Sequence, residues 1–289
     1  MDLSIIIVNY NTSDLTIQAI KSIYQSHTKY SYEIFVVDNA SSDHSVKLIE
    51  REFSDINMII NNKNVGFSRA NNQAIKKAIG KYILLLNSDT VIKHDTIEIM
   101  LDFMNRETTV GASGCKVVLP DGSLDKACRR GFPTPSASFY YMSGLSRVFP
   151  KSVKFNQYHL SYLDENEANP IDCLVGAFML VRKDVVDEVG LLDETFFMYG
   201  EDIDWCYRIK EVGWDIYYYP LTSIVHLKGG STNKKKPTKI IYEFYRAMYL
   251  FHKKHYQSKY ILPVNCVIYF GIWSKFSVEY MRNKLLSSR

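Results

Sequence analysis

The chain of 289 residues is 46% hydrophobic and has only 14 Gly and 8 Pro, which indicates a globular protein and excludes a disordered or collagen-like one. Its five cysteines form no CxxC pair, which is typical of a reduced, cytoplasmic protein without a structural zinc site. The net charge of +4 is unevenly spread, because residues 228–289 carry 13 Lys and Arg against two acids, whereas the remainder carries 22 against 29.

Short apolar runs alternate with amphipathic stretches over the first 118 residues. The apolar runs are rich in β-branched residues and predict buried strands at residues 3–8, 33–37, 57–60, 82–86 and 110–118. The stretches between them predict helices at about 12–24, 41–53, 67–79 and 95–105. This alternation indicates an α/β fold, with a Rossmann-like, mostly parallel sheet that is covered by helices on both faces.

Three of the predicted strands end in polar residues, at Asn9-Tyr10-Asn11, Asp38-Asn39 and Asn87-Ser88-Asp89. Right-handed crossovers bring such strand ends to one edge of the sheet, where α/β proteins bind ligands. No GxGxxG or GxxxxGK[ST] motif is present, so the phosphates of a ligand would be held in another way, most simply by a metal ion. The alternative is that residues 87–89 form only a turn before the next helix.

The alternation stops between residues 120 and 170, which hold five of the eight prolines. Arg129 and Arg130 stand there beside a Gly-Phe-Pro turn. A long irregular segment is typical of a functional loop, although a surface excursion with solvated arginines explains it nearly as well. Regular structure returns in the apolar run 174–181, where Gly176 and Ala177 would let another group approach the backbone closely.

Three acids, Glu201, Asp202 and Asp204, open the next predicted helix. The helix dipole favours acids there, but their mutual repulsion exceeds what capping requires. Bulky apolar residues precede them and predict partial burial, which raises the pKa of a carboxyl group toward that of a general base. Further along, His226 ends an apolar run. That position suits a metal ligand, and an ordinary hydrogen-bonded histidine is the alternative.

These motifs, in this order over about residues 3–230, resemble the glycosyltransferase family 2 enzymes, which are inverting, nucleotide-sugar-dependent transferases of the GT-A fold. Within that family, the chain looks most similar to the bacterial O-antigen and cell-wall rhamnosyltransferases. The resemblance is carried by six stretches, at residues 6–11, 36–43, 64–72, 85–89, 176–182 and 197–204.

The resemblance implies a donor site with a divalent metal, Mn²⁺ or Mg²⁺. Residues 87–89 match the family's DxD motif, but Asn87 replaces its first Asp, so the implied protein ligands are Asp89 and His226. Asp38 would accept a hydrogen bond from the N3–H of a uracil or thymine base. The other implied nucleotide-binding residues are Asn9, Tyr10, Asn11, Asn64, Arg69, Asn87 and Ser88.

The resemblance also implies that Asp202 is the catalytic base, with Glu201 as the second candidate. The implied donor is dTDP-L-rhamnose, with a UDP-hexose as the alternative, and the implied acceptor is a glycan or a polyprenyl-diphosphate-linked sugar. Candidate contacts to the donor sugar or the acceptor are Arg130, Gly176, Ala177, Asp204 and Trp205.

We expect three parts: a nucleotide-sugar-binding half at 1–118, an acceptor-binding and catalytic half at 119–230, and a basic helical tail at 231–289. The apolar run 260–273 is shorter than the roughly 20 residues that cross a bilayer. The tail would either lie on an anionic membrane surface or pack on the catalytic domain. No nucleic-acid-binding motif or secretion signal is present, so we expect a cytoplasmic protein, peripheral on the inner membrane face, without a nucleic-acid partner.

Overall fold

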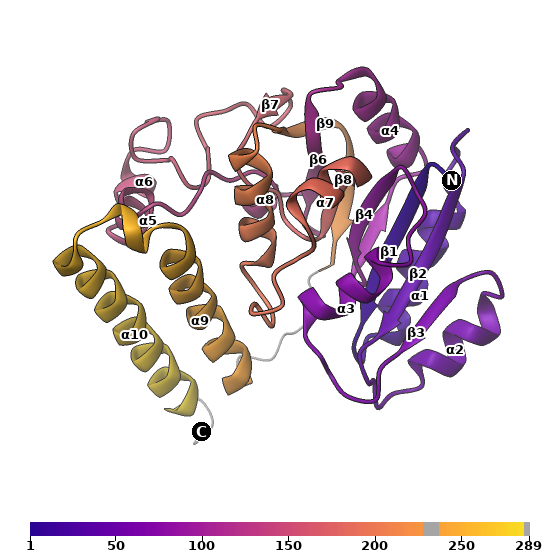
Figure 1. The fold of residues 1–289 in the computed structure, drawn as a ribbon, viewed down its shortest axis with the longest axis horizontal. Coiled ribbons are helices and arrows are strands. Elements are labelled where there is room, and N and C mark those ends of the chain that lie inside the picture. Colours follow the sequence, from indigo (N-terminus) through magenta and orange to yellow (C-terminus); the bar gives the residue numbers. More distant parts are fainter. Residues whose placement is uncertain (228–236, 286–289) are drawn as a thin grey trace.

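A computed structural model describes residues 1–227 and 237–285 (Figure 1). The expected boundary at residue 230 and the glycine-containing loop after His226 lie outside the described residues. The core is a sheet with the strand order β3-β2-β1-β4-β8-β6-β9-β5, to which β7 is added beside β9. The strands are β1 (Leu3–Asn9), β2 (Tyr32–Asp38), β3 (Asn57–Ile60), β4 (Tyr82–Asn87), β5 (Thr90–Ile92), β6 (Val110–Val118), β7 (Asn169–Pro170), β8 (Phe178–Arg182) and β9 (Asp215–His226).

The first half of the sheet has the predicted alternation. Strand β1 pairs in parallel with β2 and β4, and β2 pairs in parallel with β3. Strands β1 and β4 are almost wholly buried because helices cover both faces, which explains their unbroken apolar runs. The helices that connect these strands are α1 (Ser13–Tyr24), α2 (Ser45–Glu52), α3 (Phe67–Ile75) and α4 (Thr96–Arg106).

The second half of the sheet is mixed, which refines the expectation of a mostly parallel sheet. Strand β8 lies between β4 and β6 and is antiparallel to both. The excursion between β6 and β8 explains this direction. Because β6 and β4 share one direction, the excursion must both leave and re-enter the sheet at the edge where these two strands end. It contains two short helices, α5 (Pro135–Met142) and α6 (Leu145–Val148).

Helices α7 (Lys183–Val189) and α8 (Glu201–Glu211) precede β9, and α9 (Thr238–His255) and α10 (Leu262–Leu285) follow it. Helix α9 packs on the domain through a second apolar cluster, which contains Phe196 and Tyr207 together with Ala247, Phe251 and Tyr256. Helix α10 packs on α9 and lies at the outside of the molecule (Figure 1). Packing of the tail on the domain is therefore correct for α9. In the described ranges, no helix combines the length and hydropathy needed to span a membrane.

Asp204 joins the tail to the domain from a fully buried position. Its Oδ1 lies 2.7 Å from both His255 Nε2 and Lys254 Nζ on α9, and its Oδ2 accepts a hydrogen bond of 2.9 Å from Arg208 Nε. Burial alone would raise the pKa of this carboxyl group, but the bond from His255 and the charges of Arg208 and Lys254 outweigh it and lower the pKa to about 2.

We expect Asp204→Ala to lower the free energy of unfolding by about 3–5 kcal/mol, because the substitution removes a fully buried carboxylate and leaves partly buried Arg208 and Lys254 without their partner. Urea denaturation at pH 7 measures the change. Asp187→Ala is a matched control, because Asp187 also pairs with a cation one helical turn away but its side chain is 62% exposed. The control should change stability by less than about 1 kcal/mol. Equal effects of the two substitutions would contradict a structural role for Asp204.

Candidate active site

The three polar strand ends lie side by side, as the sequence predicts. Asn9 of β1 is in register with Asp38 of β2, and Val8 beside it is in register with Asn87 of β4. Strand β9 also ends at this edge, because it is parallel to β6, and its last residue is His226. The carboxyl edge of the sheet therefore gathers chemistry-bearing residues from four strands.

Asn9 and Asp38 form the buried base of this edge. Asn9 Nδ2 donates to Asp38 Oδ1 at 2.7 Å, and Asn9 Oδ1 accepts from the hydroxyl of Thr16 at 2.7 Å. The second Asp38 oxygen accepts from the backbone N–H of Ser41 at 2.9 Å. Both side chains are almost inaccessible to solvent, so in this conformation they shape the turn rather than present free polar atoms.

Tyr10 and Asn11 form the exposed part of the same turn. Asn11 has a φ of 55°, a left-handed conformation that asparagine tolerates better than most residues. Its Oδ1 accepts from the backbone N–H of Ser42 at 2.7 Å, which links the turns after β1 and β2. Tyr10 is 49% exposed and stands beside this link, where it could contact a ligand.

Asn39 connects the end of β2 to the loop before α3, and it was not among the predicted site residues. Its Oδ1 accepts from the backbone N–H of Val65 at 3.0 Å, and its Nδ2 donates to Asn64 Oδ1 at 3.1 Å. Asn64 Oδ1 also accepts from the backbone N–H of Gly66 at 3.0 Å. The spacing of Asn39 directly after Asp38, at a strand end, was the available signal.

The turn of residues 87–89 is fixed mainly through backbone groups. The N–H of Asn87 donates to the carbonyl oxygen of Ala177 at 3.2 Å, and the carbonyl oxygen of Asp89 accepts from the N–H of Leu227 at 2.8 Å. The hydroxyl of Ser88 lies 3.1 Å from that of Thr12. The structure thus gives Ala177 a backbone role in holding this turn.

Asp89 and His226, which lie far apart in the sequence, meet at this turn. Asp89 Oδ1 is 3.2 Å from His226 Nε2, and the other ring nitrogen, Nδ1, is 3.3 Å from Asp125 Oδ2. Burial would lower the pKa of His226, but its hydrogen bonds with Asp125 and Asp89 outweigh burial and raise the pKa to about 9. Asp125 comes from the irregular segment after β6, and nothing in the sequence pattern pointed to it.

This arrangement fits a divalent metal. Two ligands at about 2.1 Å and right angles around one Mg²⁺ or Mn²⁺ are separated by about 3 Å, close to the distance between Asp89 Oδ1 and His226 Nε2. Asp125 stands where a second carboxylate commonly orients a metal-binding histidine. Within residues 1–227 and 237–285, no group of three or more acidic, His or Cys side chains is arranged to hold an ion. Phosphate oxygens of a bound ligand would complete the coordination.

Hydrogen bonds from α3 hold the segment before the acidic start of α8 at the same edge of the sheet. The backbone N–H of Phe67, the first residue of α3, donates to the carbonyl oxygen of Phe197 at 2.7 Å. The hydroxyl of Ser68 donates to the carbonyl oxygen of Phe196 at 2.6 Å. Gly66 allows this contact, because a Cβ on it would lie 2.7 Å from the Phe197 carbonyl oxygen. Asp202 follows shortly after Phe197 in the chain.

Asp202 and Arg130 form an ion pair at the start of α8, with 2.6 Å between Asp202 Oδ2 and Arg130 Nη2. Their side chains are 12% and 9% exposed, so the carboxylate is accessible but not freely solvated. Arg130 Nη2 also donates to the carbonyl oxygen of Leu174, and Asp202 Oδ1 accepts from the N–H of Ile203 at 2.8 Å. Arg130 therefore fixes the orientation of the Asp202 carboxylate.

Glu201 is the more deeply buried neighbour, and its Oε2 has no hydrogen-bond partner among the described residues. Burial and the neighbouring charge of Asp202 together raise the pKa of Glu201 to about 8. At neutral pH, Asp202 is therefore the better suited of the two to accept a proton, since Glu201 already holds one.

We expect Glu201→Gln to stabilise the fold at pH 8 and to leave it nearly unchanged at pH 4. The unfolded chain releases the Glu201 proton near pH 4.5, whereas the folded protein keeps it up to about pH 8, so stability is lost as pH rises through this window. Glutamine has no proton to lose and avoids this cost. Urea midpoints at both pH values measure the change in stability. Glu211→Gln, at the exposed end of α8, is the control. An equal shift at pH 4 and pH 8 would contradict the raised pKa.

The other predicted residues have varied surroundings. Arg69 is 60% exposed in its side chain and pairs at 3.6 Å with Glu194. A Cβ on Gly176 would lie 3.6 Å from the ring of Phe67, so this glycine stands beside the start of α3. Trp205 is fully buried and donates to the carbonyl oxygen of Gly190 at 2.9 Å. The structure does not bring Trp205 or Asp204 to the accessible edge.

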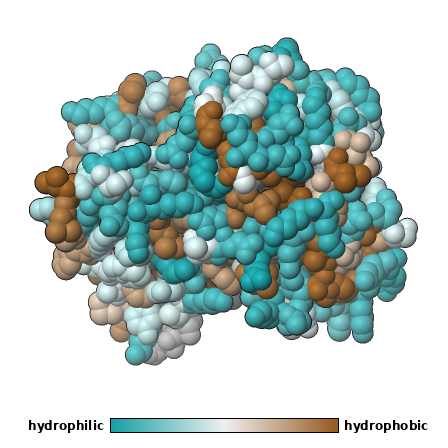
Figure 2. All heavy atoms as spheres, in the orientation of Figure 1, coloured by the Kyte–Doolittle hydropathy of each residue, from teal (hydrophilic) through white to brown (hydrophobic). Residues whose placement is uncertain are grey.

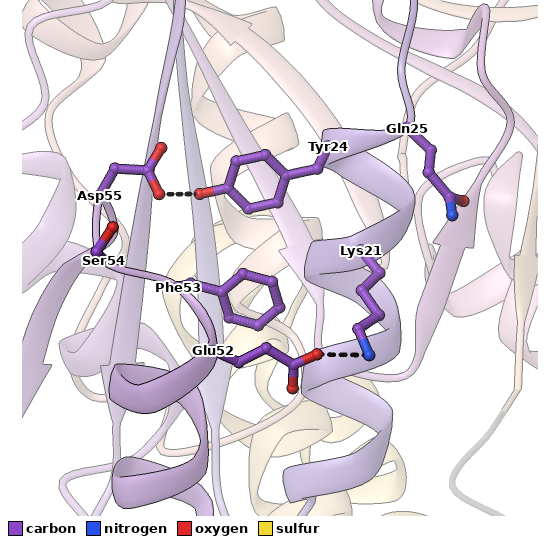
Figure 3. A pocket seen from close by; sticks show the side chains of 7 residues that line it. All are labelled: Lys21, Tyr24, Gln25, Glu52, Phe53, Ser54 and Asp55. Atoms are coloured by element: carbon purple, nitrogen blue, oxygen red, sulfur yellow. Dashed lines mark hydrogen bonds and ion pairs between the residues drawn. The ribbon is translucent and has the colours of Figure 1, made fainter.

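A separate hollow of about 500 Å³ lies between the ends of α1 and α2 (Figure 3). Tyr24 stacks there on Phe53 with ring centroids 5.5 Å apart, and Lys21 forms an ion pair with Glu52. Helix α1 starts at the carboxyl edge of the sheet and ends at Tyr24, so this hollow lies at the opposite edge. Its charged groups are already paired, and it is separate from the candidate active site.

The mixed sheet and the polar carboxyl edge, with its carboxylate–histidine pair, define a glycosyltransferase of the GT-A type. Similarity to a solved structure agrees: a mannosyltransferase from Pyrobaculum calidifontis, solved with GDP-Man and Mn²⁺, superposes with a TM-score of 0.59 at 15% identity, over 96% of this chain and 70% of that one. The model of glycosyl transferase family 2 matches residues 4–190. The chain belongs to glycosyltransferase family 2.

Two of the similar relatives are named rhamnosyltransferases. The N-acetylglucosaminyl-diphospho-decaprenol L-rhamnosyltransferase of Mycobacterium tuberculosis is 25% identical over 236 residues, which cover 78% of this chain and 75% of the relative. The rhamnosyltransferase WbbL of Escherichia coli K12 is 27% identical over 231 residues, which cover 77% of this chain and 82% of the relative. Both alignments are longer than the family match.

Proposed function

We propose that the protein is an inverting glycosyltransferase that moves L-rhamnose from dTDP-L-rhamnose to a hydroxyl group of a polyprenyl-diphosphate-linked glycan. The observation that carries this proposal is its similarity, over more than three quarters of the chain, to two proteins that are both named rhamnosyltransferases. The name of the mycobacterial relative includes a sugar on a diphospho-decaprenol carrier, which supports a lipid-linked acceptor. The product would enter cell-surface polysaccharide.

In the proposed reaction, Asp202 is the general base. It takes the proton of the acceptor hydroxyl while that oxygen forms a bond to the anomeric carbon and the bond from this carbon to the diphosphate breaks. One displacement inverts the anomeric centre, so no covalent intermediate on the protein is required. The ion pair with Arg130 supports this role, because it orients the Asp202 carboxylate before the acceptor binds.

The donor diphosphate would lie at the turn of residues 87–89. Asp89 and His226 would hold Mn²⁺ or Mg²⁺ there, and the metal would stabilise the negative charge on the leaving nucleoside diphosphate. Asp38 and Asn9 would support the base-binding turn from below, and the exposed Tyr10 would line the base or the ribose.

Thermal shift and product analysis test the donor. The protein is incubated with Mn²⁺ and dTDP-L-rhamnose, UDP-glucose or UDP-N-acetylglucosamine, and the melting temperature is compared for each donor. A synthetic N-acetylglucosaminyl-diphospho-polyprenol is then supplied, and mass spectrometry detects an added deoxyhexose. Stabilisation and transfer with dTDP-L-rhamnose are expected. If only UDP-sugars stabilise the protein, it is instead a UDP-hexose-dependent transferase.

We further propose that the protein works at the cytoplasmic face of a membrane, where lipid-linked acceptors present their sugars. The strongly basic composition of residues 228–289 supports this location, because anionic headgroups attract Lys and Arg side chains.

A further inference from the structure

Helix α10 exposes two pairs of large apolar side chains, which form a stripe on the face that points away from α9. Val267, Phe270, Val278 and Met281 are 55–76% exposed, and their spacing places them on one side of a helix. On the opposite side, Phe276 contacts rings of α9, with centroids 5.9 Å from those of Tyr242 and Tyr245. The stripe therefore remains exposed to solvent although α10 packs on α9.

The excursion around α5 and α6 exposes a second apolar set. Phe139, Met142, Val148, Phe149 and Val153 are 48–68% exposed. No Asp or Glu occurs between residues 131 and 163, so the whole segment is apolar, neutral or basic. Exposed large apolar side chains that gather on one part of a soluble protein commonly mark an interaction site.

These two sets lie on the same side of the molecule. Phe132, just before α5, packs against the apolar cluster of α9, with its ring centroid 4.9 Å from that of Tyr207. In Figure 1, α5, α6 and α10 occupy the side farthest from β3, and Figure 2 shows hydrophobic side chains at the margin where α10 begins. We name the exposed side chains of residues 139–153 and of the α10 stripe the apolar-basic face.

The positive charges of this face favour an anionic partner. Arg147, Lys151 and Lys154 accompany the first set, and Lys275 and Arg282 flank the α10 stripe. In the part of the chain that the structure describes, none of these five forms an ion pair with an acid. A second copy seated on this face would bring the same positive charges into contact, whereas anionic lipid neutralises them while its acyl chains accept the apolar stripe.

We propose that the apolar-basic face is a two-part docking surface for an anionic lipid bilayer. Helix α10 lies in the interface with its stripe toward the acyl chains, and the tips of α5 and α6 insert beside it. The Lys and Arg side chains reach outward to the headgroups. The inference deepens the proposed membrane location, on which it rests, by naming the elements that touch lipid. Arg130, which pairs with Asp202, lies five residues before the start of α5, so docking through α5 would hold the proposed base close to the lipid surface.

Vesicle flotation tests the surface without any glycosyl transfer, so its result is independent of the donor and acceptor assignment. The full-length protein is mixed with vesicles of phosphatidylcholine alone or of equal parts phosphatidylcholine and phosphatidylglycerol. We expect binding to the anionic vesicles only. Val267→Glu/Phe270→Glu in α10 and Val148→Glu/Phe149→Glu in α6 should each weaken partition by at least about tenfold. Lys275→Gln/Arg282→Gln should weaken it by about fivefold for each charge removed.

Ile79→Glu/Leu221→Glu is the matched control, because these residues are 70% and 67% exposed but belong to neither set. The control should bind vesicles like the unchanged protein, and all variants should keep their melting temperature. Absence of binding to anionic vesicles, or equal losses in the control and in both test variants, would overturn the proposal. A dimer in light scattering that the α10 variant dissociates would overturn it too, since a second copy would then cover the stripe.

Discussion

Asp202→Asn is expected to lower kcat for sugar transfer by about 10²- to 10⁴-fold, the usual contribution of a general base. The amide keeps the size of the carboxylate and an oxygen that can accept from Arg130, but it cannot take the acceptor proton. The proposed donor and metal ligands belong to other elements, so binding of dTDP and Mn²⁺ should stay nearly unchanged. Initial rates at saturating donor, together with calorimetric binding of dTDP, measure the two effects separately.

Glu201→Gln is the matched comparison on the neighbouring carboxylate. Because the pKa of Glu201 is raised to about 8, this side chain is mostly protonated at neutral pH, and glutamine resembles that form. Most of the transfer activity should therefore remain. An inactive Glu201→Gln beside an active Asp202→Asn would reassign the base to Glu201.

Arg130→Gln tests the proposed base through the pH dependence of sugar transfer. Removing the cation 2.6 Å from Asp202 takes away a charge that lowers the pKa of the neighbouring Glu201, so this pair of carboxyl groups should hold a proton to higher pH. The acidic limb of the kcat/KM profile should then move to higher pH. An unchanged profile with normal activity would show that the ion pair does not govern the base.

The N-terminal half of the fold was predictable because its signals are local. The strands β1, β2 and β4 are buried on both faces, so each appears as an apolar run that ends abruptly in polar residues. Parallel pairing then requires those ends to meet, and the register of Asn9 with Asp38 confirms it. Helical periodicity placed α1 and α4 to within a few residues of their observed bounds.

The second half of the fold depends on contacts between residues far apart in the chain, and such contacts produce no periodic pattern in the sequence. The direction of β8 is set by where the excursion after β6 returns to the sheet, and its short apolar run reads the same in either direction. Asp125 sits in a loop and becomes part of the site only because β9 brings His226 beside it. The pairing of Arg130 with Asp202 likewise joins residues 72 positions apart.

The placement of the C-terminal helices also depends on contacts that the sequence pattern does not reveal. Composition revealed its positive charge, but the choice between packing and lipid contact depended on which side of each helix is covered. Asp204 illustrates this, because its buried contacts with His255 and Lys254 assign α9 to the domain, whereas α10 packs on α9 and exposes its apolar stripe. Both alternatives from the sequence therefore apply, each to a different helix, if the apolar-basic face binds lipid as proposed.

Asp89→Ala is expected to abolish detectable transfer, whereas Asn87→Ala should leave measurable activity. Asp89 supplies a carboxylate oxygen 3.2 Å from His226 Nε2, so its loss removes one of the two proposed protein ligands and the only anionic one. Asn87 is neutral, and it holds the turn through its backbone N–H, which alanine retains. The difference should appear in metal binding as well as in rate.

Electron paramagnetic resonance of Mn²⁺ in the presence of dTDP measures that binding without catalysis. Asp89→Ala should weaken it strongly, Asn87→Ala only slightly, and His226→Ala should resemble Asp89→Ala, since both remove a ligand from the same pair. Melting temperatures establish that each variant is folded. The reverse ranking, with Asn87→Ala losing Mn²⁺ and Asp89→Ala keeping it, would place the metal on the other side of the turn and separate it from His226.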